Sequence, residues 1–327
     1  MEGMTGRGPS RRDFLTIGAG VFAVSTLGLT MTQRRLVRRT VPVMGTIAEI
    51  AVVARNERTA HGAIDAAVAE LRAVERMMTR FDATSDIGRA NRAVAGTAVA
   101  VSGATALVVA EALRWARIPG SGFDPAIGRA VELWDVAHRT SPPAARDVGA
   151  LARRGLHRHV EVGTSNGRDV LVFHDDDVAL DLGGIAKGYA VDRAVAALRE
   201  WGVANALVNA GGDLYALGTS LEGDDWQVGI RSPDSPYGIT ATRPLRDGAI
   251  ATSGDYEQHF MHDGRRYHHL LDPETAAPRA TGVHSLTIAA ASCISADAAA
   301  TALFGIAPER SGSVIARAGD GVAIVAG

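Results

Sequence analysis

Short apolar segments of this chain tend to follow one another directly, without a helix between each pair. Residues 160–162 and 170–173 are two such segments, separated by a turn sequence at residues 164–167 (TSNG). Neighbouring parallel strands need a long crossover, usually a helix, whereas antiparallel strands can be joined by a short turn. Amphipathic helical patterns occur elsewhere, for example at residues 58–81. The sequence therefore predicts an α+β body of antiparallel sheets packed with helices, at residues 41–327.

The charge balance and the cysteine count exclude several classes of protein. The 34 lysine and arginine residues nearly cancel the 36 aspartate and glutamate residues, and the formal net charge is −2. Nucleic-acid-binding proteins usually carry a basic patch and a high pI, so we expect no nucleic acid as a partner. The single cysteine, Cys293, excludes an internal disulfide and any metal cluster built on several thiolates.

The N-terminus combines an arginine pair with an uncharged stretch. Residues 10–15 read SRRDFL, and no charged side chain occurs at residues 16–33. This order resembles a twin-arginine export signal, and a basic tail with no signal function is the alternative. We predict an export signal and linker at residues 1–40, and a periplasmic or other extracytoplasmic location. If the signal stays uncleaved, we expect it to attach the protein to the membrane.

Residues 181–192 (DLGGIAKGYAVD) are the strongest candidate for a binding site. An expected strand delivers Asp181, then Gly183 and Gly184 form a turn, and a helix begins beside them. Backbone amides at a helix start, together with the ammonium of Lys187, suit a diphosphate. A strand–turn–helix connection with a solvated lysine explains the same residues equally well. Neither a Walker loop nor a dinucleotide-binding fingerprint is present.

A second glycine pair, Gly211 and Gly212, lies within an apolar segment at residues 206–217. We expect one strand that these glycines interrupt. Glycines inside a strand mark either the close approach of a ligand or an ordinary bulge, and the sequence leaves both readings open.

Two adjacent histidines, His268 and His269, follow the segment at residues 251–256 (ATSGDY). Successive side chains of a strand point to opposite faces, so at most one of the two can reach a given site. The alternative to a catalytic role is a buried histidine held by Asp272.

Asp297 and Thr301 lie four residues apart in an alanine-rich segment, residues 295–306, that is expected to be helical. This spacing places both side chains on the same face of a helix. Carboxylate, hydroxyl and carbonyl oxygens are hard ligands that suit Mg²⁺, with substrate phosphates completing the coordination. A helix capped by Ser295, with Asp297 in its first turn, is the structural alternative.

Taken in order, these segments resemble the ApbE family, the FAD:protein FMN transferases. The likeness extends from residue 41 to residue 306, and it rests on the order and spacing of eight short segments. These segments are residues 44–46 (MGT), 85–91 (SDIGRAN), 122–125 (GFDP), 181–192, 209–213 (NAGGD), 251–256 (ATSGDY), 269–273 (HLLDP) and 296–301 (ADAAAT). The resemblance implies a T-fold-like architecture of antiparallel sheets and helices.

The resemblance also implies roles for individual residues. Those implied to contact FAD are Met44, Phe81, Gly122, Phe123, Asp124, Asp181, Lys187 and Leu271. The Gly184 carbonyl, Asp297 and Thr301 are implied to bind Mg²⁺, and His269 is implied to be the general base. The implied reaction transfers the FMN part of FAD to a threonine or serine hydroxyl of an acceptor flavoprotein and releases AMP. The acceptor is expected to carry the motif Asp-x-x-[Ser/Thr]-Gly-Ala-[Thr/Ser].

Two other functions are compatible with the same residues. With water in place of the acceptor hydroxyl, the protein would be an Mg²⁺-dependent FAD pyrophosphatase that forms FMN and AMP. Without catalysis, it would be an exported flavin-binding protein. The sequence also departs from the family at Phe81, where many members have tyrosine, and at Ala276, where a glycine is usual. The first change predicts stacking without a hydrogen bond, and the second predicts a differently shaped loop.

Overall fold

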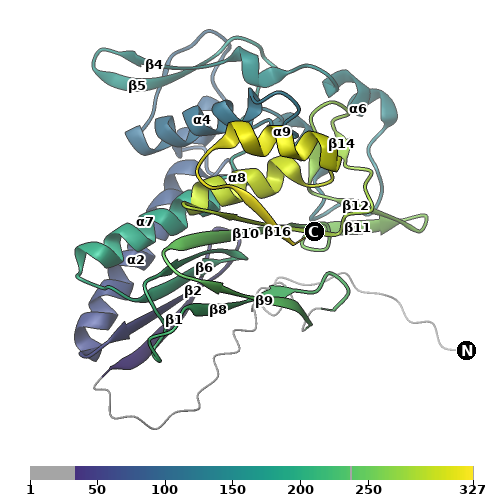
Figure 1. The fold of residues 1–327 in the computed structure, drawn as a ribbon. Helices are drawn as coiled ribbons and strands as arrows, with labels where there is room; N and C mark the ends of the chain where they lie inside the picture. Colours follow the sequence, from purple (N-terminus) through teal and green to yellow (C-terminus); the bar gives the residue numbers. More distant parts are fainter. Residues whose placement is uncertain (1–33, 236–237, 327) are drawn as a thin grey trace, which may run out of the picture.

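One seven-stranded sheet organises the computed structural model, which describes residues 34–235 and 238–326 (Figure 1). Every neighbouring pair of strands in it is antiparallel, as the paired apolar segments predict. In sheet order, the strands are β1 (Arg35–Val43), β2 (Thr46–Ala54), β6 (Ala206–Ala210), β7 (Asp213–Leu217), β10 (Gly248–Gly254), β15 (Ser285–Ala290) and β16 (Ala323–Ala326).

Three helices pack on one face of this sheet: α2 (Glu57–Met78), α7 (Ala186–Glu200) and α8 (Cys293–Leu303) (Figure 1). Helix α2 begins after Asn56, whose side chain accepts hydrogen bonds from the amides of the first turn. Its buried residues, which include Ile64, recur at helical spacing and join the main core. Helices α2 and α7 confirm the amphipathic helices expected from the sequence.

The opposite face of the sheet is covered by a hairpin of β8 (Trp226–Arg231) and β9 (Ile239–Leu245). Figure 1 shows this hairpin on the side of the sheet away from the helices. Trp226 belongs to the same buried cluster as Leu207 and Ile250 of the large sheet. Both faces of the central strands are therefore buried, which explains why these strands are almost entirely apolar.

The remaining elements surround this layered centre. The additional helices are α3 (Asp86–Ala90), α4 (Gly103–Ala116), α5 (Gly128–Trp134), α6 (Ala145–Leu151), η1 (Leu156–His159) and α9 (Pro308–Ala318). The additional strands are β3 (Val99–Ala100), β4 (Val160–Ser165), β5 (Arg168–Phe173), β11 (His259–His262), β12 (Arg265–His268), β13 (Leu271–Asp272) and β14 (Ala277–Pro278). The mixture of helices and antiparallel sheets confirms the predicted α+β class.

Strand β1 begins at Arg35, ahead of residue 41, where the sequence places the start of the body. It pairs with β2 along its whole length, so these residues belong to the sheet. The predicted export signal falls on residues 1–33, which lie outside the described residues. Among the described residues, no helix is long and apolar enough to cross a membrane.

The strand expected to end at Asp181 is absent from the described structure, where this stretch makes only one isolated bridge, between Ile127 and Ala179. Its backbone is bonded by a side chain instead. Asn91 Nδ2 donates to the Leu180 carbonyl at 2.9 Å, and the Leu180 N–H donates to Asn91 Oδ1 at 2.8 Å. An apolar run can satisfy its backbone in this way without a neighbouring strand, and sequence pattern does not reveal it.

The expectation of one strand interrupted by Gly211 and Gly212 is also wrong. The two glycines form the turn between β6 and β7, with φ of 65° and 100°. Positive φ at both positions is the conformation that glycine adopts most readily, so the pair makes a tight hairpin turn.

Candidate functional site

Two turns meet at one end of the large sheet and bring Met44 close to the start of β7. Met44 lies in the β1–β2 turn with φ of 53°. Gly211 of the β6–β7 turn donates its N–H to the Ile47 carbonyl at 3.2 Å. A Cβ atom on Gly211 would lie 2.6 Å from the Thr46 hydroxyl, so only glycine allows this approach. Asp213, which follows that turn, therefore lies at the same end of the sheet as Met44.

A buried charge cluster occupies this end of the sheet. Lys187 of α7 forms an ion pair with Asp213, and its Nζ lies 3.5 Å from Asp297 Oδ1. Asp213 is 2% exposed and Asp297 is 3% exposed. Burial opposes the charge of Lys187, but the two carboxylates outweigh it and raise the pKa of this lysine. Burial and the nearby Asp297 raise the pKa of Asp213. The site thus holds a fixed ammonium between two carboxylates.

A close contact between α7 and α8 places Asp297 opposite the start of α7. Gly188 donates its N–H to Asp297 Oδ2 at 2.9 Å, and a Cβ atom on Gly188 would collide with the Cys293 carbonyl. The carboxylate of Asp192 accepts from the N–H groups of Cys293 and Ile294 at 2.8 and 2.9 Å. Burial raises the pKa of Asp192 to about 6. The last residue of the 181–192 segment therefore caps α8 and fixes its position.

The prediction of free amides at the start of α7 is not supported. The N–H groups of Ile185 and Ala186 both donate to the Leu182 carbonyl, at 3.1 and 2.9 Å. The N–H of Gly188 is bonded to Asp297. Since these donors are already used within the protein, a diphosphate would meet the side chain of Lys187 more readily than a row of open backbone amides.

Two of the three groups predicted to bind a metal, the Gly184 backbone and the Thr301 side chain, lie against each other at this contact, and Asp297 precedes Thr301 by four residues on α8. A Cβ atom on Gly184 would lie 2.8 Å from Thr301 Oγ1 and 3.2 Å from the Phe123 ring, so its backbone packs against both side chains. The Thr301 hydroxyl makes no hydrogen bond to the residues that the structure describes. Among the described residues, the one hydrogen-bond partner of Asp297 Oδ1 is Lys187, at 3.5 Å.

This set fits a hard cation whose remaining ligands come from a substrate or from water. It contains one carboxylate, one hydroxyl and one backbone carbonyl. In the described part of the chain, no group of three or more His, Cys, Asp or Glu side chains is arranged to hold a metal ion. A cation that arrives with phosphate ligands is compatible with one carboxylate, one hydroxyl and one carbonyl.

Phe81 and Asp181 are joined by an arginine that the sequence analysis did not single out. Arg80 Nε lies 2.8 Å from Asp181 Oδ2, and the Arg80 guanidinium lies 4.3 Å from the centre of the Phe81 ring. Phe81 is 79% exposed, so its ring is available for stacking on a flat ligand. The only available signal for Arg80 was its place beside Phe81.

Replacing Phe81 by alanine is expected to weaken FAD binding by about two- to tenfold, which is the range that a lost aromatic stack of about 0.5–1.5 kcal/mol produces. The melting temperature should not change, because the exposed ring contributes little to the core. Quenching of flavin fluorescence in the absence of Mg²⁺ measures the affinity. Phe81→Tyr, which keeps the ring, is the matched control, and an alanine variant with wild-type affinity would contradict this role.

The loop from Gly122 to Asp124 lies beside Asp181, whose N–H donates to the Pro125 carbonyl at 2.8 Å. The carboxylate of Asp124 is buried and shares a 2.8 Å hydrogen bond with His157 Nδ1, and it accepts from the Ala126 N–H. This side chain is thus occupied in shaping its own loop. Contact between Asp124 and FAD stays a prediction.

His268 and His269 bond to different parts of the chain. His268 is buried and lies 3.1 Å from the Arg279 carbonyl, with no bond to Asp272. His269 Nδ1 lies 3.3 Å from the Gln258 carbonyl, which can only accept, so Nδ1 carries the proton and Nε2 keeps a lone pair. Burial lowers the pKa of His269 to about 4, and the positive charge of Lys187 acts in the same direction. At neutral pH this ring is an uncharged base.

Several other functional candidates escaped the sequence analysis. Asp213 was recognised only as part of a motif, although its GGD context could have marked it as a partner for Lys187. Glu257 pairs with Arg231, and burial raises the pKa of its carboxyl. Nothing in the sequence marked Arg279, which is a buried arginine. Ala276, which stands where the family usually has glycine, adopts φ of 52°, in the left-handed region that favours glycine.

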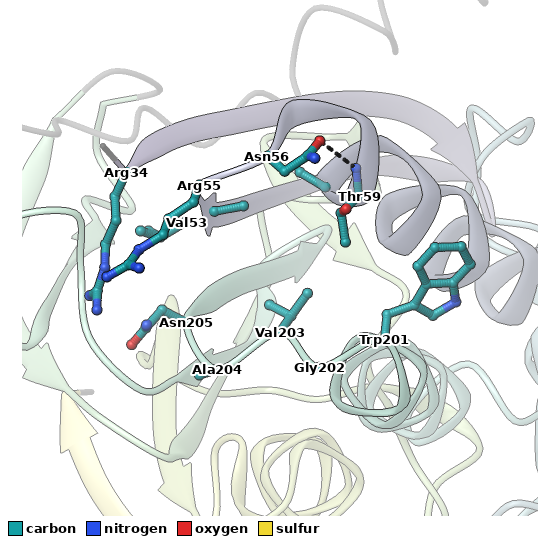
Figure 2. Close-up of a pocket in the computed structure, with 12 residues that line it drawn as sticks. Arg34, Val53, Arg55, Asn56, Thr59, Trp201, Gly202, Val203, Ala204 and Asn205 are labelled. Atoms are coloured by element: carbon teal, nitrogen blue, oxygen red, sulfur yellow. Dashed lines mark hydrogen bonds between the residues drawn. The ribbon is translucent and has the colours of Figure 1, made fainter. Parts of the chain in front are cut away.

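A hollow of about 270 Å³ lies at a different place, between the start of α2 and the end of α7 (Figure 2). Arg34, Arg55 and Trp201 are among the described residues that line it, and neither a carboxylate nor an imidazole is among them. The Asn56 side chain is used to cap α2. None of the predicted site residues lines this hollow, so it is separate from the candidate site.

Comparison with known proteins identifies the family of the chain. The model of the ApbE family matches residues 44–326. The FAD:protein FMN transferase of Treponema pallidum (strain Nichols) is 33% identical over 290 residues, which cover 82% of this chain and 78% of that protein. Flavin transferase ApbE from Vibrio cholerae superposes with a TM-score of 0.74 at 30% identity, covering 86% and 90% of the two chains. The apo form of the Pseudomonas stutzeri flavinyl transferase ApbE gives a TM-score of 0.76 at 27% identity, covering 90% and 92%. The chain belongs to the ApbE family.

Proposed function

We propose that this protein transfers the FMN part of FAD to a threonine or serine hydroxyl of an acceptor flavoprotein and releases AMP. The observation that carries the proposal is the contact of Lys187 with Asp297, together with the uncharged His269, in a chain whose relatives are named FAD:protein FMN transferase. These are a cation for phosphate, a metal ligand and a base, which are the groups that phosphoryl transfer requires.

The proposed step replaces a phosphoanhydride bond of FAD by a phosphoester bond to the acceptor. The acceptor hydroxyl gives its proton to Nε2 of His269 while its oxygen attacks the phosphorus on the FMN side of FAD. The bond from that phosphorus to the bridging oxygen breaks, and AMP leaves with the electron pair. Lys187 offsets negative charge on the phosphoryl oxygens, and its own position is fixed by Asp213. His269 then returns the proton to solvent.

We also propose that Mg²⁺ assists this reaction. The Gly184 carbonyl, the Asp297 carboxylate and the Thr301 hydroxyl would hold it; the packing of Gly184 against Thr301 and the four-residue spacing of Asp297 and Thr301 on α8 support this. A bound Mg²⁺ supplies further neutralisation of phosphate charge. Residues Met44, Phe81, Asp181 and Leu271 would line the remainder of the FAD site.

The pH dependence of the reaction follows from the pKa of His269. Because this pKa is lowered to about 4, the ring is already a free base above that pH. We expect the protonation of His269 to have no effect on kcat/KM for FAD between about pH 5 and 7, and we expect kcat/KM to fall as the pH drops through about 4. Circular dichroism at each pH checks that the protein is folded. A loss of rate that begins near pH 6.5, where an ordinary histidine titrates, would contradict this prediction.

The function can be tested with the full-length protein, FAD, MgCl₂ and a small acceptor protein that carries the motif Asp-x-x-[Ser/Thr]-Gly-Ala-[Thr/Ser]. We expect a fluorescent acceptor band on a denaturing gel, and we expect EDTA to abolish it. An acceptor whose motif hydroxyl is replaced by alanine is the matched control. A dark acceptor with free FMN and AMP would instead identify a pyrophosphatase, and intact FAD would identify a binding protein.

The location of the protein is a separate proposal. The arginine pair and the uncharged stretch after it support export by the twin-arginine route to the periplasm or another extracytoplasmic space. An uncleaved signal would attach the enzyme to the membrane, where exported acceptors could meet it.

A further inference from the structure

Arg279 is a buried cation whose side chain bonds only to backbone carbonyls in the described structure. It follows β14 and is 8% exposed. Its Nε donates to the Leu271 carbonyl at 3.3 Å, and its Nη1 donates to the Thr301 carbonyl at 3.0 Å. Its guanidinium also donates to the carbonyls of Phe304 and Gly122. One side chain therefore ties together three segments that are far apart in the sequence.

This arrangement is costly and so requires an explanation. Within residues 34–235 and 238–326, Arg279 has no carboxylate within ion-pair distance. Burial lowers the pKa of Arg279 to about 10, which still leaves it charged at neutral pH, and Asp272 only partly counters this effect. A buried charge without a carboxylate partner is expensive, and an apolar side chain could fill a core position at a lower cost. The free energy that offsets this cost must come from the hydrogen bonds that Arg279 donates to the four carbonyls.

Those carbonyls belong to the walls of the proposed flavin site. Gly122 and Leu271 are two of the residues expected to contact FAD, and Thr301 is one of the expected Mg²⁺ ligands. The last carbonyls of α8 have no partner within the helix. Arg279 donates to the Thr301 carbonyl, and the Gly122 N–H donates to the Ala302 carbonyl at 3.0 Å. A Cβ atom on Gly122 would lie 2.6 Å from Arg279 Nη2, so the loop and the guanidinium are fitted closely to each other.

We propose that Arg279 is a positioning residue for flavin binding, which holds the Gly122 loop and Leu271 at a fixed place relative to the end of α8. The inference rests on the proposed FAD site, and it adds a residue that touches neither FAD nor the reacting atoms. Because a planar guanidinium has five N–H donors in a fixed fork, it can bond several carbonyls at once, whereas the ammonium of lysine is a single point.

The test is Arg279→Lys in the full-length protein. The variant keeps the positive charge but cannot span all four carbonyls, so we expect the dissociation constant for FAD to rise about tenfold, measured by flavin fluorescence without Mg²⁺. The KM for FAD should rise by a similar factor, while kcat at saturating FAD should stay within about threefold of wild type, since His269 and Lys187 are unchanged. Arg279→Met, which lacks any donor, should weaken binding further.

Arg114→Lys is the matched control. Arg114 also donates to a backbone carbonyl, that of Ala318 at 3.1 Å, but it lies on α4 and is paired with Glu111. Its lysine variant should bind FAD as wild type does. A folded Arg279→Lys protein with unchanged FAD affinity would overturn the proposal, and so would a loss confined to kcat. If the wild type binds FAD but labels no acceptor, the proposed function fails while the affinity test of Arg279 still stands.

Discussion

Asp297→Asn is expected to reduce kcat/KM for flavin transfer by about a thousandfold or more. Asp297 is the one carboxylate in the oxygen set with Gly184 and Thr301, and its Oδ2 is already fixed by the Gly188 N–H. Asparagine keeps the shape but removes the negative charge, and its amide nitrogen would either face Lys187 or displace the bond to Gly188. Loss of the metal removes several kcal/mol of charge stabilisation, and about 1.4 kcal/mol corresponds to tenfold in rate.

The measurement is the initial rate of acceptor labelling across a series of Mg²⁺ concentrations. We expect the variant to need far more Mg²⁺ and not to reach the wild-type rate at saturation. Asp192→Asn is the matched control: it also removes a carboxylate that bonds across the α7–α8 contact, but Asp192 is not among the proposed metal ligands. It should lower the melting temperature and keep the Mg²⁺ dependence. An Asp297→Asn protein with the wild-type Mg²⁺ dependence would refute the proposed metal site.

His269→Ala is expected to lower kcat by about 10²–10⁴-fold, the usual contribution of a general base. The bond from Nδ1 to the Gln258 carbonyl and the lowered pKa together leave Nε2 ready to accept a proton at neutral pH. FAD affinity should change little, because His269 is not among the residues implied to contact FAD. Rapid mixing under single-turnover conditions separates the chemical step from binding and release.

The neighbouring His268 provides the control for this variant. His268 is buried and bonded to the Arg279 carbonyl and the Leu270 N–H. His268→Gln should therefore lower the free energy of unfolding and leave the pH dependence assigned to His269 in place. If the His268 variant loses the chemical step and the His269 variant keeps it, the assignment of the base is wrong.

The sequence predicts the antiparallel sheets and the helices well, because these depend on local periodicity and on short turns. The resemblance also assigns Lys187, Asp297 and His269 to one site, and the structure places Lys187 beside Asp297. The strand expected before Asp181 was wrong because the Asn91 side chain, distant in sequence, bonds that backbone. Side-chain contacts across such separations leave no periodic signal.

The least predictable residues are those whose role comes from tertiary burial. Arg279 follows a proline in a short loop, a context in which an arginine is usually exposed. Its role depends on the end of α8 and on the Gly122 loop, and both arrive from distant parts of the chain. The amides at the start of α7 were predicted to be free for the same reason: Asp297, which occupies one of them, is 109 residues away.

Mass spectrometry of the acceptor tests the central claim most directly. Full-length protein, FAD, MgCl₂ and acceptor are incubated, and the intact acceptor and its peptides are then analysed, together with the AMP released. The account predicts that the acceptor gains the mass of FMN less one water on the motif threonine or serine, with one AMP formed for each flavin attached. FMN and AMP released in equal amounts, with an acceptor of unchanged mass, would contradict it.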